Sequence, residues 1–147
     1  MTDTAAPPGT CTCFRLRKLA RLVTLRYDRA LAPLGINLNQ YSILRRASRT
    51  PQAMGALARE MGMDRTTLTR DLKPLTAAGW VEMVSGEDAR QRLVTVTNAG
   101  RRVLEKARPL WRRAQDEIDS SLGTTRVEAL HSHIDRALAR LDPGANA

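Results

Sequence analysis

The chain has 147 residues, of which 42% are hydrophobic and 27% are charged, so it is long enough and apolar enough to build a hydrophobic core. Its formal net charge of +9 indicates a polyanionic partner, with nucleic acid ahead of an anionic membrane surface, although arginine-rich bacterial proteins are often basic without one. Aromatic residues make up only 3% and are scattered, which argues against a stacking platform for single strands and favours duplex binding.

The same composition argues against export and against a membrane span. No apolar run approaches ~20 residues, and the polar start of the chain does not resemble a secretory signal. The two cysteines, Cys11 and Cys13, lie too close in sequence to stabilise a fold by a disulfide. So few cysteines are typical of a protein in a reducing compartment. We therefore expect a cytoplasmic protein.

The first third of the chain predicts an arm followed by two helices. Residues 1–10 are polar and contain proline and glycine, which is typical of a disordered arm. Residues 11–31 carry apolar side chains at every third or fourth position, so they predict an amphipathic helix that ends before Pro33 and Gly35. A second helix follows at once. Either of two asparagines can cap it, and Thr50-Pro51 ends it.

The two candidate caps of the second helix are Asn37 and Asn39. A short third helix is expected from about Gln52 to Met61, before a turn at Gly62. A fourth helix is expected to begin after the cap residue Asp64 and to end at Gly79, with a bend or a weakened last turn at Pro74.

The last third of the chain predicts a β-hairpin and two further helices. Residues 80–84 and 92–96 flank a polar tip, and the second of these strands alternates apolar and polar side chains. Thr97 is expected to cap a long fifth helix, which Pro109 is expected to kink. A sixth helix is expected to open at Thr125, with Glu128 completing a capping box.

The order of these elements over residues 37–97 is that of a winged helix-turn-helix, so the fold class is mainly α with a small β-hairpin wing. The fourth helix and the wing tip are rich in basic and short polar side chains, which suit the grooves of duplex DNA. The predicted DNA-binding residues are Arg65, Thr66, Thr67, Thr69, Arg70, Lys73, Arg90 and Arg92. Asp88 is expected to brace Arg90 from two residues away. The alternative is a helix face that is merely solvated.

The sequence resembles the MarR family of bacterial regulators over residues 13–142. The segments that carry the resemblance are Leu38-Asn39-Gln40-Tyr41-Ser42-Ile43-Leu44, Leu57-Ala58, Arg65-Thr66-Thr67-Leu68-Thr69-Arg70, Leu75, Gly79-Trp80-Val81, Asp88-Ala89-Arg90-Gln91-Arg92 and Val96-Thr97-Asn98-Ala99-Gly100. The resemblance implies a homodimer, joined through residues 11–36 and 98–143, on a pseudo-palindromic operator. The expected dimerisation residues are Leu16, Leu130, Ile134 and Leu138.

The resemblance also implies a small-molecule effector, held between the dimerisation layer and the winged domain. Arg17, Arg21 and Tyr27 are the candidate pocket residues. Charge is unevenly divided between segments: residues 1–50 carry nine basic groups against two acidic ones, whereas residues 51–100 carry six of each. DNA affinity must then depend on where individual charges point, unless the first helix also faces DNA or an anionic ligand.

The two cysteines are candidate redox residues. Cys13-Phe14-Arg15-Leu16 resembles the start of the first helix in the organic-hydroperoxide-sensing branch of the family, and Tyr27 matches one of that branch's tyrosine partners. Arg17 and Leu38 stand where that branch has tyrosines, and no C-terminal cysteine is present to resolve an oxidised Cys13. The alternative is that Cys11 and Cys13 are ordinary thiols.

The sequence supports other functions less well. A zinc site of both cysteines with His131 and His133 is disfavoured, because residues two apart on a helix point to nearly opposite sides. We predict neither a metal nor a cofactor. No phosphate loop or nucleophile elbow is present, so we predict no enzyme. The stronger alternative is an architectural DNA-binding protein that lacks sequence preference.

Overall fold

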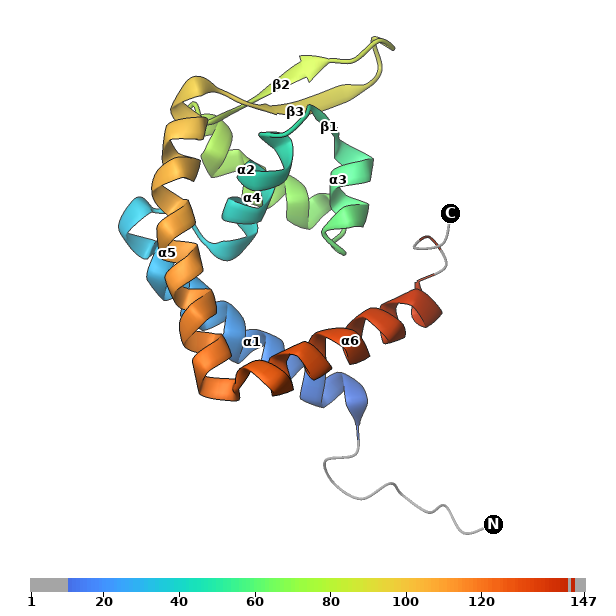
Figure 1. Ribbon diagram of the computed structural model, residues 1–147. Helices are drawn as coiled ribbons and strands as arrows, with labels where there is room; N and C mark the ends of the chain where they lie inside the picture. Colours follow the sequence, from blue (N-terminus) through green and yellow to red (C-terminus); the bar gives the residue numbers. More distant parts are fainter. Residues whose placement is uncertain (1–10, 143, 145–147) are drawn as a thin grey trace. The chain divides into compact units, whose positions relative to one another are not determined.

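A computed structural model describes residues 11–142 and 144 (Figure 1). The arm expected at residues 1–10 and the last residue of the expected dimerisation region, 143, lie outside the described residues. The chain divides into two compact units, residues 1–111 and 112–147. In chain order the elements are α1 (Thr12–Leu31), a 3-10 turn η1 (Ala32–Leu34), α2 (Leu38–Ala47), β1 (Gln52–Ala53), α3 (Met54–Glu60), α4 (Arg65–Ala77), β2 (Val81–Ser85), β3 (Arg92–Val96), α5 (Asn98–Leu122) and α6 (Thr124–Leu141). Within the described residues no helix is long and apolar enough to cross a membrane.

The core of the first unit is formed by apolar side chains that recur at helical or strand spacing along α2, α3, α4 and the sheet. Leu31 of α1 and Leu104 of α5 complete this core. Its other fully buried members are Ile43, Leu44, Leu57, Leu68, Leu75, Val81 and Val94. Helices α2, α3 and α4 therefore turn their predicted apolar sides inward, and the mainly α fold with a β-hairpin is confirmed.

The expected helix over residues 52–61 is wrong at its start, because Gln52 and Ala53 form a strand. Gln52 pairs with Val94 and Ala53 with Leu93, so β1 is antiparallel to β3 in a three-stranded sheet of order β1-β3-β2. The backbone of Ala53 is extended, and α3 begins only at the next residue. Pairing with the open edge of β3 satisfies backbone groups that a helix would otherwise have used.

The start of α2 is fixed by a capping box. The side chain of Asn37 accepts a hydrogen bond from the Gln40 backbone N–H at 2.9 Å, and the Gln40 side chain accepts one from the Asn37 N–H at 3.0 Å. Asn37 is therefore the cap that the sequence left open between two asparagines. Asp28 of α1 accepts a further bond from the Leu38 N–H at 2.8 Å, which ties α1 to the start of α2.

Both predicted ends of α4 are confirmed. Asp64 is the N-cap, and its carboxylate accepts a hydrogen bond from the Thr67 N–H at 2.7 Å. At the other end Gly79 has φ of 71°, and the Trp80 N–H donates to the Leu75 carbonyl at 3.0 Å, which completes a Schellman motif. The helix continues through Pro74 to Ala77.

The wing is joined tightly to α5. The Thr97 hydroxyl donates to the Gly79 carbonyl at 2.6 Å and accepts from the Gly100 N–H at 3.1 Å, so the predicted cap of the fifth helix is confirmed. Gly100 lies against the Trp80 carbonyl so closely that a Cβ atom would collide with it. This junction fixes the hairpin at its base.

The second unit contains the end of α5 and all of α6. The capping box expected from Thr125 and Glu128 is wrong, because α6 begins one residue earlier, after Gly123, and has no side-chain cap. Gly123 has φ of 88°, a conformation that glycine adopts without strain and that lets the chain turn directly into the helix. Val127 is the buried residue of α6.

Candidate nucleic-acid interface

The helix α4 presents a basic and polar surface opposite its buried side. Leu68, Leu72 and Leu75 are buried. Successive residues are turned by about 100° around a helix, so Thr66, Arg70 and Lys73 lie on the side away from these leucines, and all three are exposed. Such an exposed helix of short polar and basic side chains suits the major groove of DNA.

The other predicted residues of α4 differ in how available they are. Arg65 and Thr69 are exposed, whereas Thr67 is half-buried. The Thr69 hydroxyl donates to the Arg65 carbonyl at 2.8 Å, so its proton is already used within the helix and its oxygen remains able to accept a hydrogen bond. Thr67 is therefore the least accessible of the predicted DNA-binding residues.

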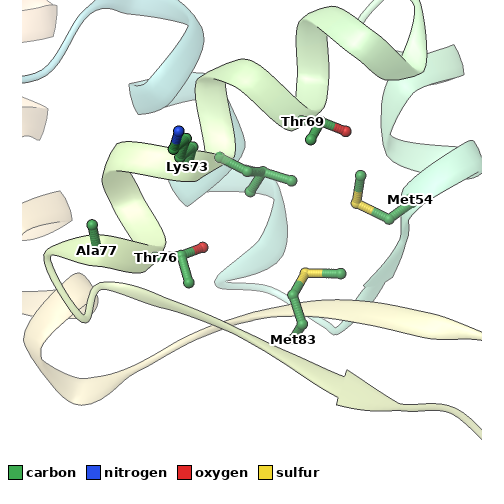
Figure 2. Close-up of a pocket in the computed structure, with 7 residues that line it drawn as sticks. Met54, Thr69, Lys73, Thr76, Ala77 and Met83 are labelled. Atoms are coloured by element: carbon green, nitrogen blue, oxygen red, sulfur yellow. The ribbon is translucent and has the colours of Figure 1, made fainter.

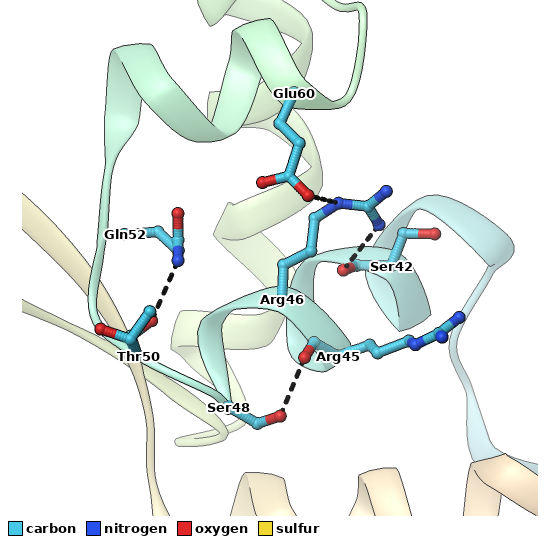
Figure 3. A network of polar contacts seen from close by, with 7 residues as sticks. All are labelled: Ser42, Arg45, Arg46, Ser48, Thr50, Gln52 and Glu60. Atoms are coloured by element: carbon cyan, nitrogen blue, oxygen red, sulfur yellow. Dashed lines mark hydrogen bonds and ion pairs between the residues drawn. The ribbon is translucent and has the colours of Figure 1, made fainter. Parts of the chain in front are cut away.

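Polar contacts from α2 hold both neighbouring helices. The Asn39 side chain donates to the Asp71 carboxylate of α4 at 3.0 Å. The Arg46 guanidinium forms an ion pair with Glu60 of α3 at 2.8 Å (Figure 3). Arg46 also donates to the Ser42 carbonyl of its own helix at 3.4 Å. These contacts join segments up to 32 residues apart, and no local pattern in the sequence indicated them.

The wing tip is a compact loop with exposed arginines. The Asp88 carboxylate accepts a hydrogen bond from the Arg90 backbone N–H at 3.0 Å, and the Gln91 N–H donates to the Asp88 carbonyl at 2.8 Å. The expected bracing by Asp88 is thus made to the backbone of Arg90. Arg90 and Arg92 are both exposed.

Residues 51–100 carry equal numbers of acidic and basic side chains, but the acidic ones are mostly engaged in contacts within the fold. Four of the six acidic side chains are engaged within the fold, as Glu60 pairs with Arg46, Asp71 accepts from Asn39, Asp64 caps α4 and Asp88 bonds the wing backbone. The hydrogen bonds from Thr67 lower the pKa of Asp64, with a smaller contribution from the charge of Arg70. Within residues 11–142 and 144, no predicted DNA-binding cation takes part in an ion pair. These cations are Arg65, Arg70, Lys73, Arg90 and Arg92.

The candidate effector residues belong to α1 and not to α4 or the wing. Tyr27 is buried and stacks on Trp111 with ring centroids 5.9 Å apart, and Tyr41 stacks on Trp111 at 5.8 Å. Arg17 and Arg21 are exposed on α1. Tyr27 is thus part of an aromatic stack that holds α1, α2 and α5 together.

Both cysteines are free and exposed at the start of α1. Cys11 is the N-cap residue of that helix and makes no side-chain cap bond. Exposure leaves both thiols accessible to an oxidant.

Comparison with known proteins identifies the family. Residues 34–91 match the profile of the MarR family. The transcriptional activatory protein BadR of Rhodopseudomonas palustris is 34% identical over 142 residues, which cover 90% of this chain and 81% of BadR. The chain belongs to the MarR family. A crystal structure of the Mycobacterium tuberculosis transcriptional regulator MosR with DNA is 38% identical, with a TM-score of 0.76 and coverage of 90% of this chain and 98% of MosR.

As a member of the MarR family, the chain is a DNA-binding transcriptional regulator with a winged helix-turn-helix fold. MarR of Escherichia coli, 24% identical with a TM-score of 0.69 over 87% of this chain and 97% of MarR, shares that fold. The structure of MosR in complex with DNA supports DNA as a partner of this chain.

Proposed function

We propose that the protein is a repressor that binds a pseudo-palindromic operator as a homodimer and leaves it when a small effector or an oxidant acts. The observation that carries the proposal is the exposed basic side of α4, whose cations are unpaired within the described residues while neighbouring carboxylates are engaged by the fold. In this proposal α4 enters the major groove, and Arg90 and Arg92 of the wing contact the minor groove or the phosphates.

Exposed apolar side chains support the homodimer. On α1, Phe14 and Leu22 are 59% and 55% exposed, and Leu16 is 50% exposed. On α6, Leu138 is 55% exposed, and Leu130 and Ile134 are only half-buried. Contact with a second copy would remove this apolar surface from water, which is the main driving force for association. In this proposal residues 11–36 and 98–143 form the dimerisation region, and residues 37–97 form the DNA-binding domain.

DNA release is proposed to follow one of two signals. For a small effector, the proposed binding residues are Arg17, Arg21 and Tyr27 of α1. For an oxidant, the proposed targets are Cys11 and Cys13, whose thiols are exposed. Repression is proposed even though BadR is named an activatory protein. A promoter fusion decides the sign: deletion of the gene should raise expression from the bound promoter, whereas a fall would identify an activator.

The experiment that tests the core proposal compares DNA affinity for the region upstream of the gene with affinity for a scrambled duplex of the same length. A regulator should prefer its operator by ~10³ or more at physiological salt. Sedimentation of the same sample should give two protein chains per operator. Equal affinity for both duplexes would instead identify an architectural DNA-binding protein.

A further inference from the structure

Methionine is concentrated around α4. Four of the five methionines lie on α3, on β2 or between α3 and α4, and the fifth is the first residue of the chain, outside the described residues. Met54 begins α3, Met61 is its C-cap, Met63 precedes α4, and Met83 belongs to β2. All four are half-buried and pack against the core of the first unit. The thioethers of the described residues therefore lie close to the helix that bears most of the proposed DNA-binding residues.

Two of these side chains line a cavity of about 490 Å³ between α4 and the wing (Figure 2). Met54 and Met83 reach it from α3 and β2, and the remaining lining residues, among them Leu72, belong to α4. Met61 and Met63 do not line it. A water molecule occupies about 30 Å³ in the liquid, so the cavity can admit a molecule of a few heavy atoms to either of the two lining thioethers.

A thioether that a small molecule can reach is a site for two-electron oxidation. With hypochlorous acid the net reaction transfers one oxygen to sulfur: an S–O bond forms, the Cl–O bond breaks, and chloride and a proton leave. Sulfur loses two electrons and chlorine gains them, so the reaction needs no further reactant. Organic hydroperoxides oxidise thioethers much more slowly, so this chemistry is separate from that proposed for the cysteines.

Oxidation at this place changes how α4 is packed. Methionine sulfoxide is polar, whereas the cavity is lined by apolar side chains apart from Lys73 and two threonines. The buried Leu72 side chain faces the same cavity and offers the sulfoxide no hydrogen bond. The oxidised side chain is therefore more stable in water than in its place against α4, and its departure removes part of the packing that holds this helix.

We propose that Met54 and Met83 form a reversible oxidation site, at which hypochlorous acid enters the cavity, converts the thioethers to sulfoxides and weakens DNA binding by loosening α4. Methionine sulfoxide reductases, one for each epimer of the sulfoxide, reverse the reaction. The site is separate from Cys11 and Cys13 at the start of α1. The link to DNA release rests on the proposed function, whereas the oxidation of these two methionines does not.

The first test maps the products in the full chain with both cysteines replaced by serine, so that no thiol competes for the oxidant. The protein is treated with limiting hypochlorous acid, digested with trypsin and analysed by mass spectrometry. Trypsin places Met54 and Met83 in separate peptides, and Met61 and Met63 together in a third. Sulfoxide should form first on Met54 and Met83, because these two line the cavity. Equally early oxidation of the third peptide would contradict access through the cavity.

The second test measures DNA binding of the same cysteine-free protein by fluorescence anisotropy of a labelled operator duplex. Oxidation should lower operator affinity about tenfold, and treatment with both reductases should restore it. Met54→Leu with Met83→Leu keeps apolar side chains of similar volume, so this variant should bind the operator as before and should keep its affinity after oxidation. Met61→Leu with Met63→Leu is the matched control and should lose affinity as its parent does.

The outcomes separate the parts of the proposal. Equal loss of affinity by the Met54→Leu, Met83→Leu variant and by its parent would place the effect elsewhere, and the proposal would be wrong. Sulfoxide on both residues without any change in affinity would leave the site and overturn its coupling to DNA. Circular dichroism should show the helices retained after oxidation, and their loss would contradict a local change at α4. An absence of sequence preference before oxidation would overturn the proposed function and leave the mapped oxidation standing.

Discussion

Asn39 at the start of α2 donates a hydrogen bond to the carboxylate of Asp71 on α4, with 3.0 Å between Nδ2 and Oδ2. Beside it the buried Gln40 side chain donates to the Asp71 carbonyl at 3.5 Å. Helices α2 and α4 are thus joined by polar contacts as well as by their apolar core. Because Asp71 lies on the side of α4 toward α2, it fixes the rotation of the helix that bears Arg70 and Lys73.

We expect Asp71→Ala to lower operator affinity, because the Asp71 carboxylate is bonded to Asn39 of α2 and helps to orient α4. Loss of a partly exposed hydrogen bond should cost about 0.5–1 kcal/mol of stability. A double-mutant cycle with Asn39→Ala, measured by urea unfolding and by operator titration, should show coupling in both quantities. Strictly additive effects on DNA affinity would mean that the contact does not orient α4.

Arg70→Ala and Lys73→Ala are expected to differ in kind. An arginine that contacts a base edge contributes specificity. Arg70→Ala should therefore reduce the difference in binding free energy between operator and scrambled DNA by about 1–3 kcal/mol. Lys73 is expected to contact phosphate, so its loss should weaken all sequences alike and reduce the salt slope by about one. Titrations of both variants against both duplexes at several salt concentrations check this. Uniform scaling by both variants would contradict direct readout by α4.

Much of this surface could be predicted from the sequence, and the reasons are local. Leu68, Leu72 and Leu75 recur at helical spacing, and Asp64 and Gly79 are strong end signals, so α4 and its outer side follow from the sequence near it. The third strand could not be predicted in this way. Gln52 and Ala53 carry no periodic signal, and their conformation depends on an edge of β3 that lies about 40 residues away in sequence.

Contacts between segments that are distant in sequence could likewise not be predicted. The sequence predicts Asn39 as a candidate helix cap, whereas its hydrogen-bond partner Asp71 is 32 residues away. A cavity beside α4 is lined by residues of three elements, among them Met54, Thr76 and Met83, and none of these residues stands out in the sequence. The start of α6 was misplaced because Gly123 turns the chain into the helix without any side-chain cap.

Asp64 is expected to make stability depend on pH in a defined direction. Hydrogen bonds from Thr67 lower the pKa of Asp64 in the folded protein. The stabilisation is therefore complete above the ordinary aspartate pKa and is lost as pH falls through the lower, folded value. Urea midpoints should show Asp64→Ala less stable than wild type at about pH 7, with the difference shrinking toward about pH 2. An equal difference at both pH values would mean that the charge on the cap contributes nothing.

Ile134→Asp should disrupt the proposed dimer. Ile134 is half-buried on α6, so a carboxylate there would be buried without a partner once a second copy packs against the helix. Size-exclusion chromatography with light scattering should show aggregated or unfolded protein rather than a stable monomer. Ser132→Asp, at an exposed position of the same helix, is the matched control and should remain dimeric. A well-folded Ile134→Asp monomer that still binds the operator would contradict the dimer proposal.

Cys13 provides the test of oxidant release. An organic hydroperoxide would transfer one oxygen to the exposed thiol and leave as the alcohol, giving a sulfenic acid on Cys13. Tyr27 cannot assist within the same chain, because it lies 14 residues along the same helix, about 20 Å away, and is stacked on Trp111. The sulfenic acid would therefore persist, or condense with the thiol of Cys11, of a partner subunit or of a small molecule, with loss of water.

Operator binding is then measured before and after treatment with cumene hydroperoxide, in wild type, Cys11→Ser and Cys13→Ser. Release of wild type but not of Cys13→Ser is the expected result. Intact mass distinguishes a gain of one oxygen, which marks the sulfenic acid, from a loss of two hydrogens, which marks a disulfide within the chain. Cys11→Ser should keep the response and lose only the second of these products. Equal behaviour of wild type and Cys13→Ser, whether both release DNA or neither does, would return both cysteines to ordinary thiols and leave the small effector as the route of release.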